Sequence, residues 1–214
     1  MAVAVGYTEE GVASWYGVPY HGRPAADGEI YNMETMVAAH RLMPFNTWLL
    51  VTNLANGKTA QVRVIDRGPF VDGRIIDLSK AAARQIDLIG PGVGQVRLEV
   101  IKSPADVPTN DLYGVQVGAF SLQANAEKAR LQYVERYGAA QLAVKQGATP
   151  LWKVLVGRES SVDAAQRLAN QIRSESGIDT FVVRLDQTKP GAPATTVPPP
   201  STPAIPEPQQ SPNH

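Results

Sequence analysis

The feature that most constrains the fold is a change of pattern at residues 103–111, SPADVPTND, where polar residues and two prolines interrupt the chain. Before this segment, short alternating runs of apolar and polar residues are separated by glycine and proline. After it, strand-like runs alternate with helical ones. Two patterns predict two domains. We expect the first at residues 11–103, a linker at 104–111 and the second at 112–186.

Both ends of the chain differ from these two domains. Residues 1–10 are interpreted as an N-terminal extension. Nine of the 17 prolines follow residue 187, in a stretch with almost nothing apolar to bury. Such a composition cannot offset the entropy lost on ordering a backbone, so residues 187–214 are expected to form a disordered, proline-rich tail with polyproline II character.

Composition excludes several classes of function. The 20 Lys and Arg balance the 20 Asp and Glu, so no excess positive charge is available for nucleic acid or an anionic membrane. The absence of cysteine excludes disulfides, thiolate nucleophiles and sulfur-ligated metals, and the three histidines lack the spacing of a helical metal site. We therefore expect no cofactor, no metal and no nucleic acid partner. No run approaches the ~18 apolar residues of a membrane span.

The sequence pattern of the first domain predicts a series of short strands. The runs WLLVTNL and TAQVRVI flank Asn56-Gly57, a dipeptide that strongly favours a β-hairpin. Further strands are expected at RIIDLS and QVRLEVI, with a short alanine-rich helix between them that Ser79 is placed to cap. Five or six short strands with one small helix in about 90 residues predict a closed barrel rather than a layered α/β sheet.

The second domain contains an internal repeat. LYGVQVGAF at 112–120 and LWKVLVGRE at 151–159 share Leu, Val, Val and Gly at matching positions. A helix is expected after each repeat. For the first helix, Ser121 is the expected N-cap and Gly138 the stop.

The second helix has a clearer apolar stripe. Ser160 and Asp163 are spaced as a capping box, and Gly177 is the expected stop. Together with strands at QLAVKQ and TFVVRL, the order is βαββαβ. Both helices on one face of a four-stranded sheet would leave the other face open to solvent as a docking surface, with Gln116 and Leu155 pointing outward.

Several ordered sequence blocks resemble a known family. In order and spacing they are similar to the double-psi β-barrel domain of the rare lipoprotein A (RlpA) family, and residues 112–186 resemble a SPOR domain, a peptidoglycan-binding module. The resemblance implies a six-stranded double-psi β-barrel followed by an α+β SPOR domain of ferredoxin-like or RNP-like topology. The blocks are GVASWYG, ADGEIYN, VAAHRLMPFNT, VTNLANGK, VRVIDRGPF and GRIIDLSKAAA.

The resemblance also implies an activity. Family members include endolytic transglycosylases that cleave the MurNAc-GlcNAc β-1,4 bond of peptide-free glycan strands and leave 1,6-anhydro-MurNAc ends. Their SPOR domains target the division septum, where divisome proteins are possible partners. Family members are envelope lipoproteins, held at the outer membrane by a lipobox cysteine. Because this sequence has neither a cysteine nor a signal-like N-terminus, we expect an engineered or processed soluble form of a periplasmic protein.

Three residues are the expected catalytic groups. Asp66 stands where VRVI runs into the turn RGPF and matches the family's catalytic aspartate. A transglycosylase uses the substrate's own 6-hydroxyl as nucleophile, so one carboxyl group can act first as acid and then as base. This role requires that Asp66 face a groove. Glu29 and His40 match the two other family positions tied to activity, Glu29 as a second carboxylate that would raise one pKa of the pair.

Each of these residues also has a structural interpretation. Asp66 could accept amides of its own turn, Glu29 could be a solvated loop residue and His40 a packed, hydrogen-bonded one. Asp72 and Asp77 are interpreted as structural, Asp77 because it precedes the helix that begins near Ser79.

Two aromatic residues and two departures from the family pattern concern the same site. Trp15 and Tyr16 are expected to stack on sugars or to pack in the core. Ala25 and Val37 stand where the family often has threonine, so two hydroxyls are missing near Asp66.

In the second domain, Gln116, Phe120 and Leu155 are the expected glycan-contacting residues. Two alternatives to the transglycosylase stay open: a non-catalytic glycan-binding protein of the septum, which the missing threonines favour, and a barrel hydrolase or expansin-like wall loosener, which needs a second carboxylate. RNA binding, which the βαββαβ order also permits, is set aside because the strands lack paired aromatics and net positive charge.

Overall fold

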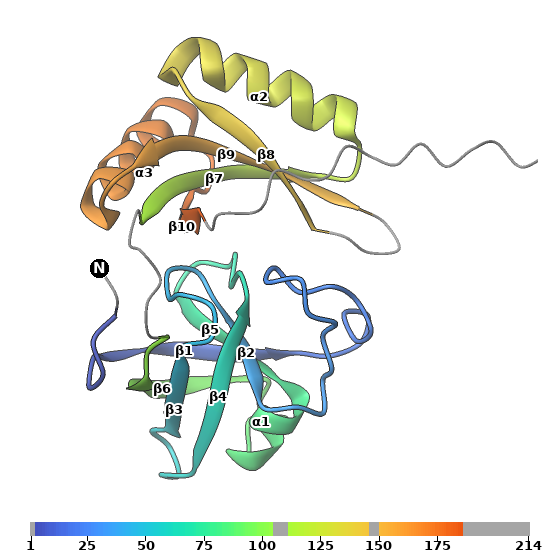
Figure 1. The fold of residues 1–214 in the computed structure, drawn as a ribbon, viewed down its shortest axis with the longest axis vertical. Coiled ribbons are helices and arrows are strands. Elements are labelled where there is room, and N and C mark those ends of the chain that lie inside the picture. Colours follow the sequence, from blue (N-terminus) through green and yellow to red (C-terminus); the bar gives the residue numbers. More distant parts are fainter. Residues whose placement is uncertain (1–2, 105–110, 146–149, 186–214) are drawn as a thin grey trace, which may run out of the picture.

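The computed structural model describes residues 3–104, 111–145 and 150–185 (Figure 1). Six strands of the first domain close into a barrel in the order β1-β5-β2-β4-β3-β6. This arrangement confirms the predicted double-psi β-barrel. Most of the expected linker and the whole proline-rich tail lie outside the described residues. The barrel elements are β1 (Thr8–Tyr16), β2 (Val37–His40), β3 (Trp48–Asn53), β4 (Thr59–Asp66), β5 (Arg74–Ser79), α1 (Lys80–Gln85) and β6 (Val93–Lys102).

The hairpin predicted at Asn56-Gly57 is present. Strands β3 and β4 pair antiparallel with Leu49 opposite Val62, and Gly57 adopts a φ of 71°, which the turn requires and glycine tolerates best. One boundary differs from the expectation: β1 begins at Thr8, within the expected N-terminal extension. The reason is pairing, because residues 8–10 continue the antiparallel ladder with β6.

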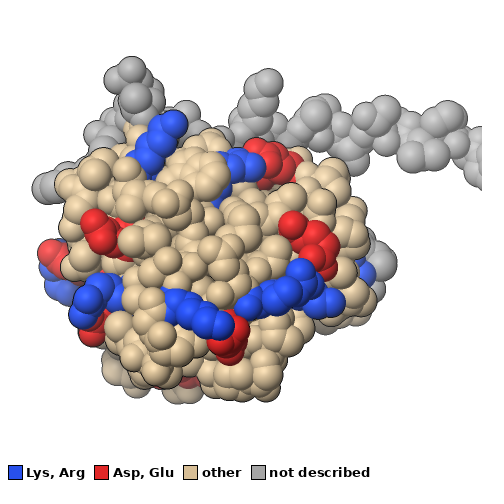
Figure 2. Space-filling view, turned by 90° about the horizontal axis from the view of Figure 1, so that it is seen from below, with Lys and Arg blue, Asp and Glu red and all other residues tan. Residues whose placement is uncertain are grey.

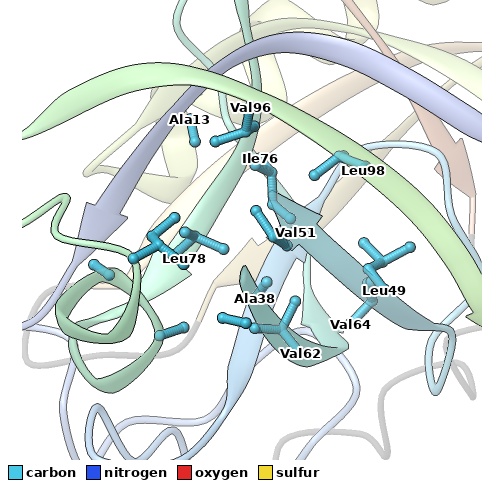
Figure 3. Close-up of a cluster of buried hydrophobic side chains, with 14 of the residues drawn as sticks. Ala13, Ala38, Leu49, Val51, Val62, Val64, Ile76, Leu78, Val96 and Leu98 are labelled. Atoms are coloured by element: carbon cyan, nitrogen blue, oxygen red, sulfur yellow. The ribbon is translucent and has the colours of Figure 1, made fainter. Parts of the chain in front are cut away.

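Alternation along the strands fills the barrel. Side chains of β3 and β4 point alternately into the interior, where every second residue is buried. Each fully buried Val or Leu contributes roughly 1.5–3 kcal/mol relative to exposure, so the alternating pattern is the main stabilising term of this domain. Figure 3 shows side chains from all six strands meeting there: Ala13, Ala38, Leu49, Val51, Val62, Val64, Ile76, Leu78, Val96 and Leu98.

Two parallel pairings place the ends of strands together. Strand β2 runs parallel to β4, with Ala39 opposite Asp66, and β1 runs parallel to β5, with Ser14 opposite Asp77. The predicted helix α1 follows β5 directly, and the Ser79 side chain accepts a hydrogen bond from the Ala82 amide, which confirms the expected cap. The barrel therefore brings the ends of β1 and β4 and the carboxylate of β5 to one region.

The second domain has the predicted βαββαβ order. Its sheet has the strand order β10-β7-β9-β8, and Figure 1 shows both helices on the same side of it. The buried core lies between that side and the helices. The elements are β7 (Leu112–Phe120), α2 (Gln123–Tyr137), β8 (Ala140–Lys145), β9 (Leu151–Glu159), α3 (Val162–Ser176) and β10 (Phe181–Leu185).

The helix stops are as expected, but the starts are not. Gly138 and Gly177 end their helices in left-handed conformations. The first helix begins after Leu122 without a side-chain cap, so the prediction of Ser121 is wrong. The cap of the second helix is Ser161, whose hydroxyl accepts from the Ala164 amide, and not its neighbour Ser160. The two serines differ by a single position, which composition alone could not resolve.

A β-bulge changes which face Phe120 occupies. Gln116 pairs with Leu155 and Gly118 with Val154, so one residue of β7 is inserted between them. The insertion reverses the alternation, and Phe120 packs against the core beneath the helices. The expectation that Phe120 shares a glycan-contacting face with Gln116 is therefore corrected.

The other sheet face is not open to solvent. Gln116 and Leu155 point away from the helices as expected, but each is only 7% exposed. The barrel lies against this face (Figure 1), and the backbone amide of Arg184 donates to the carbonyl of Arg41 in the barrel at 3.1 Å. The predicted docking surface is thus covered by the first domain.

The opposite end of the barrel carries charges of both signs (Figure 2). Among the surface pairs of this domain, Lys58 contacts Asp87 at 2.5 Å and Arg84 contacts Glu34 at 3.1 Å. Interspersed charges of this kind give a surface no extended field of one sign.

Candidate active site

Asp66 lies at the end of β4 and is held by backbone amides. Its Oδ1 accepts hydrogen bonds from the amides of Ala26 at 3.1 Å and Arg67 at 2.8 Å. One of these donors is in its own turn, as the structural interpretation of Asp66 expected, and the other is in the loop between β1 and β2. The two amides fix one oxygen and leave Oδ2 directed away from them.

The second domain supplies the partner of Oδ2. Lys145, at the end of β8, places its Nζ 3.0 Å from Oδ2 and 5.0 Å from the centre of the Tyr20 ring. Asp66 is 3% exposed, and the groove that its acid-base role requires is closed. The expectation of an open groove at Asp66 is therefore corrected: Lys145 lies between the carboxylate and the aromatic ring of Tyr20.

Two further carboxyl groups lie close enough to interact electrostatically with Asp66. Burial raises the pKa of Asp77, and the charge of Asp66 adds to the rise, although a hydrogen bond from Ser14 and the charge of Arg74 act against it. Burial also raises the pKa of Asp27, again with a contribution from Asp66. The charge of Asp66 thus contributes to the raised pKa of both Asp27 and Asp77.

Three tyrosines line the same region. The Tyr16 ring stacks on Tyr31 with centroids 4.2 Å apart and meets Tyr20 edge-on at 6.0 Å. Burial, followed by the charge of Asp66, raises the pKa of Tyr16. Its buried hydroxyl has no hydrogen-bond partner among the described residues. The Tyr16 ring packs against the cluster that contains Tyr31, which corresponds to the second of its two interpretations, and its contact with sugar stays a prediction.

Glu29 is engaged elsewhere. Both of its carboxylate oxygens accept hydrogen bonds from the Arg63 guanidinium, at 2.7 and 2.6 Å, and this hydrogen bonding lowers the pKa of Glu29. Arg63 also donates to Asn46, which occupies a left-handed turn with φ of 66°. Within the described residues, no hydrogen bond or ion pair joins Glu29 to Asp66, so the structure does not bring the expected pair of carboxylates together.

His40 is buried in a local network. Its Nδ1 accepts from the amides of Leu42 and Met43, both at 3.1 Å, and its Nε2 lies 3.3 Å from Glu9. These contacts assign the proton to Nε2 and fit the interpretation of a packed, hydrogen-bonded histidine. The link to the site is indirect, because Arg67 donates to the His40 carbonyl at 3.1 Å.

The remaining predicted residues of the barrel site pack against apolar side chains. Trp15 lies against the main core of the barrel, which corresponds to the second of its two interpretations. Ala25 and Val37, at 8% and 5% exposure, belong to a small apolar cluster with Tyr31 and Ile65. The positions where hydroxyls are missing are therefore filled by apolar packing immediately beside Asp66.

Sequence reasoning missed four contributors to this site. Asp77 carried a signal, since an aspartate between buried residues of a strand is unfavourable unless it has a role. Asp27 and Tyr20 lie in a loop with no periodic pattern. Lys145 lies in the other domain, and nothing in the sequence links position 145 to position 66.

Metal chemistry has no evident ligand set here. In the three ranges that the structure describes, no three Asp, Glu or His side chains are grouped as metal ligands. Over the same ranges, no helix is both long and apolar enough to cross a membrane.

The burial of Asp77 predicts a pH-dependent effect of Asp77→Asn. A folded-state pKa above the unfolded value means that stability is highest below the unfolded pKa, near 4, and is lost as pH rises through the folded pKa. The variant should therefore gain stability over the parent as pH rises, by about 1 kcal/mol near neutrality. Denaturant midpoints of the barrel across this pH range measure the gain. Asp72→Asn, on an exposed loop, is the control, and a constant difference between Asp77→Asn and parent would contradict the expectation.

The fold and the site define a class of protein: a double-psi β-barrel with an aspartate at a strand end, followed by a SPOR domain. Residues 8–98 match the model of a family described as lytic transglycolase, and residues 109–184 match the model of the SPOR domain.

Relatives specify the family. A Campylobacter jejuni protein named endolytic peptidoglycan transglycosylase RlpA is 44% identical over 155 residues, which cover 61% of this chain and 56% of the relative. Proteins of the same name from Helicobacter pylori (36% over 175 residues; 81% and 52%) and Pasteurella multocida (56% over 99 residues; 46% and 34%) also match. The chain belongs to the RlpA family, as its motifs indicated. It spans 56% or less of the length of each of these relatives.

Proposed function

We propose that the protein is an endolytic peptidoglycan transglycosylase that cleaves the MurNAc-GlcNAc β-1,4 bond of peptide-free glycan strands and leaves 1,6-anhydro-MurNAc ends. The observation that carries the proposal is Asp66 itself. One of its oxygens is fixed by two amides, and its charge interacts with those of Asp27 and Asp77. The names of the curated relatives support the same activity.

In the first step, Asp66 acts as the acid. Oδ1 stays on the amides of Ala26 and Arg67, while Oδ2 carries the proton to the glycosidic oxygen. The bond between the anomeric carbon and that oxygen breaks, and the electron pair stays with the departing oxygen.

In the second step, the same carboxylate acts as the base. It takes the proton from the 6-hydroxyl of the muramic acid residue as the hydroxyl oxygen bonds to the anomeric carbon. The ring closes without water, and Asp66 returns to its protonated form. The hydroxyl of Tyr16 and the ring of Tyr20 are placed to contact the sugar by hydrogen bonding and stacking.

The SPOR domain is proposed to direct this activity. Peptide-free glycan is its proposed ligand, the cell envelope its compartment and the division septum its site. There, divisome proteins are possible partners. An outer-membrane lipid anchor is part of the same proposal.

One observation favours a second candidate function. Asp66 is 3% exposed and paired with Lys145, which is what a non-catalytic glycan-binding protein would tolerate. In that case the barrel would serve as a scaffold for the septum and the strands would stay intact. A hydrolase would instead use Asp27 or Asp77 as the base that activates water.

Mass spectrometry of glycan strands incubated with the protein separates these functions. We expect anhydro ends on peptide-free strands and little product from strands that keep their stem peptides. Reducing ends would indicate the hydrolase. Intact strands, with binding retained in a sedimentation assay, would support the scaffold and contradict the proposed activity.

A further inference from the structure

One face of the second-domain sheet gathers the side chains that meet the barrel. Direct pairing of Gln116 with Leu155 and of Phe181 with Gln116 puts these three residues on the same face. Lys153 lies two positions from Leu155, and Lys145 pairs with Leu151 two positions further, so both lysines share this face. We call these five residues the inner face; it is the surface that sequence patterning predicted to be open.

The contacts of the inner face converge on the region around Asp66. Besides the ion pair of Lys145 with Asp66, the Lys153 ammonium lies 3.9 Å from the centre of the Phe70 ring. Phe70 also meets Phe181 edge-on, with centroids 6.1 Å apart. Phe70 lies in the turn that follows Asp66, so the inner face contacts the end of the strand that carries this carboxylate.

The interface continues beyond these contacts. The Arg41 guanidinium lies 5.8 Å from the Phe181 ring centre, and the Arg41 carbonyl accepts the amide of Arg184. Leu42 of the barrel packs against the core of the second domain. Backbone, aromatic and ionic contacts therefore join the domains across a single surface.

Charged and polar side chains of the inner face are wholly or partly buried where they meet the barrel. Burial, with the charge of Lys145 acting in the same direction, lowers the pKa of Lys153 to about 8. The protein thus places a desolvated ammonium over a ring rather than in water. Gln116 and Leu155, each 7% exposed, are buried, as is Asp66 at 3%. Both proposed glycan-contacting surfaces are inaccessible in the same arrangement.

We propose that the inner face of the SPOR domain is a cover for Asp66, and that a peptide-free glycan strand competes with the barrel for this face. The inference rests on the proposed function, since it assigns the regulation of the same site. In the closed arrangement Lys145 occupies the position between Asp66 and Tyr20 where the sugar would lie. A glycan strand that occupies the inner face withdraws Lys145 and exposes Oδ2, so targeting and activation are a single event.

The energetics suit a reversible cover. Among the described residues, the interface combines one ion pair, cation–π and aromatic edge contacts, a backbone hydrogen bond and the packing of Leu42. Interfaces between domains of one chain resemble transient complexes. A ligand that binds only the open arrangement shifts the population towards it, and a glycan strand on the inner face would be such a ligand.

Point variants of the full chain test the cover. Lys145→Ala removes the ion pair, and Phe181→Ala removes contacts to Phe70 and Arg41 without touching Asp66. Each should raise the rate of anhydro-product release from dilute peptide-free strands by about threefold to tenfold. Lys128→Ala, an exposed lysine of helix α2, is the matched control and should leave the rate unchanged. Parent-like rates in both interface variants would overturn the cover.

A reversible cross-link tests the same proposal without relying on activity. Because the chain has no cysteine, Phe70→Cys/Phe181→Cys carries the only two thiols. A flexible thiol-specific cross-linker that reductant cleaves should join them with high yield, and peptide-free glycan should lower that yield severalfold. A yield that glycan leaves unchanged contradicts the cover, whether or not any variant is active.

The same variant links closure to rate. Cross-linked protein should release product at least about tenfold more slowly than the same sample after cleavage by reductant. Phe70→Cys carrying the quenched reagent controls for the adduct. If parent and uncross-linked variants release no product while glycan still lowers the cross-linking yield, the proposed activity fails and the cover stands. An active parent whose cross-linked form is equally active overturns the cover and leaves the activity intact.

Discussion

Asp66→Asn should abolish release of 1,6-anhydro products, with a loss of about 10²-fold to 10⁴-fold, the range expected for removal of a general acid-base group. Asparagine is nearly isosteric and its amide oxygen can still accept the Ala26 and Arg67 amides, so the strand end should keep its shape. Its NH₂ group cannot donate an acidic proton or take one back. Chemistry should therefore be lost while the fold remains.

The measurement compares initial rates on peptide-free strands with thermal unfolding of the same samples. Asp72→Asn, on the exposed loop that follows the same strand, is the matched control and should keep the parent rate. Glycan binding by Asp66→Asn should be equal to that of the parent or stronger, since the variant loses the ion pair with Lys145. A folded Asp66→Asn variant that works at the parent rate would remove Asp66 from the mechanism.

Arg184→Met should destabilise the second domain by about 3–5 kcal/mol, the usual cost of removing one partner of a buried ion pair. Arg184 and Asp111 are both 8% exposed, and the guanidinium donates directly to the carboxylate. Methionine keeps the apolar stem but removes the guanidinium that donates to the Asp111 carboxylate, which is 8% exposed. Loss of this charge-assisted hydrogen bond, rather than lost packing, should dominate.

Denaturant unfolding followed by a probe in the second domain measures the effect, because the two domains need not unfold together. Glu127→Ala removes an exposed partner of Arg130 on α2 and should shift the midpoint little. A shift for Arg184→Met as small as that of Glu127→Ala would show that the buried pair contributes no more than a surface one.

Most of the architecture could be predicted because it depends on local signals. The Asn56-Gly57 turn, the alternation around Val62 and the cap at Ser79 each act within a few residues, and each is present. The repeat of strand and helix in the second domain likewise fixed its βαββαβ order. Such features can be predicted without knowledge of tertiary contacts.

Errors arose where one residue changes the outcome. Ser160 and Ser161 are equally good caps by type, and only the path of the backbone selects the second. The bulge between Gln116 and Gly118 moved Phe120 to the helix side, because one inserted residue reverses every side chain that follows. No compositional signal marked that insertion.

The site was predicted in part. Asp66 lies at the end of a barrel strand, as its place before the turn predicted, but it is 3% exposed and paired with Lys145 instead of facing a groove. Glu29 and His40 were assigned by resemblance, and the structure places their side chains on Arg63 and Glu9 instead. Closure of the site was not predictable, because it depends on packing between domains.

Cleavage of peptide-free glycan in water labelled with heavy oxygen tests the central proposal most directly. If Asp66 transfers a proton to the glycosidic oxygen and the 6-hydroxyl closes the ring, the new MurNAc ends should be anhydro and carry no label. Asp66→Asn should yield none of these ends. New ends that carry the label would mean that water is the nucleophile, and would contradict the transglycosylase mechanism.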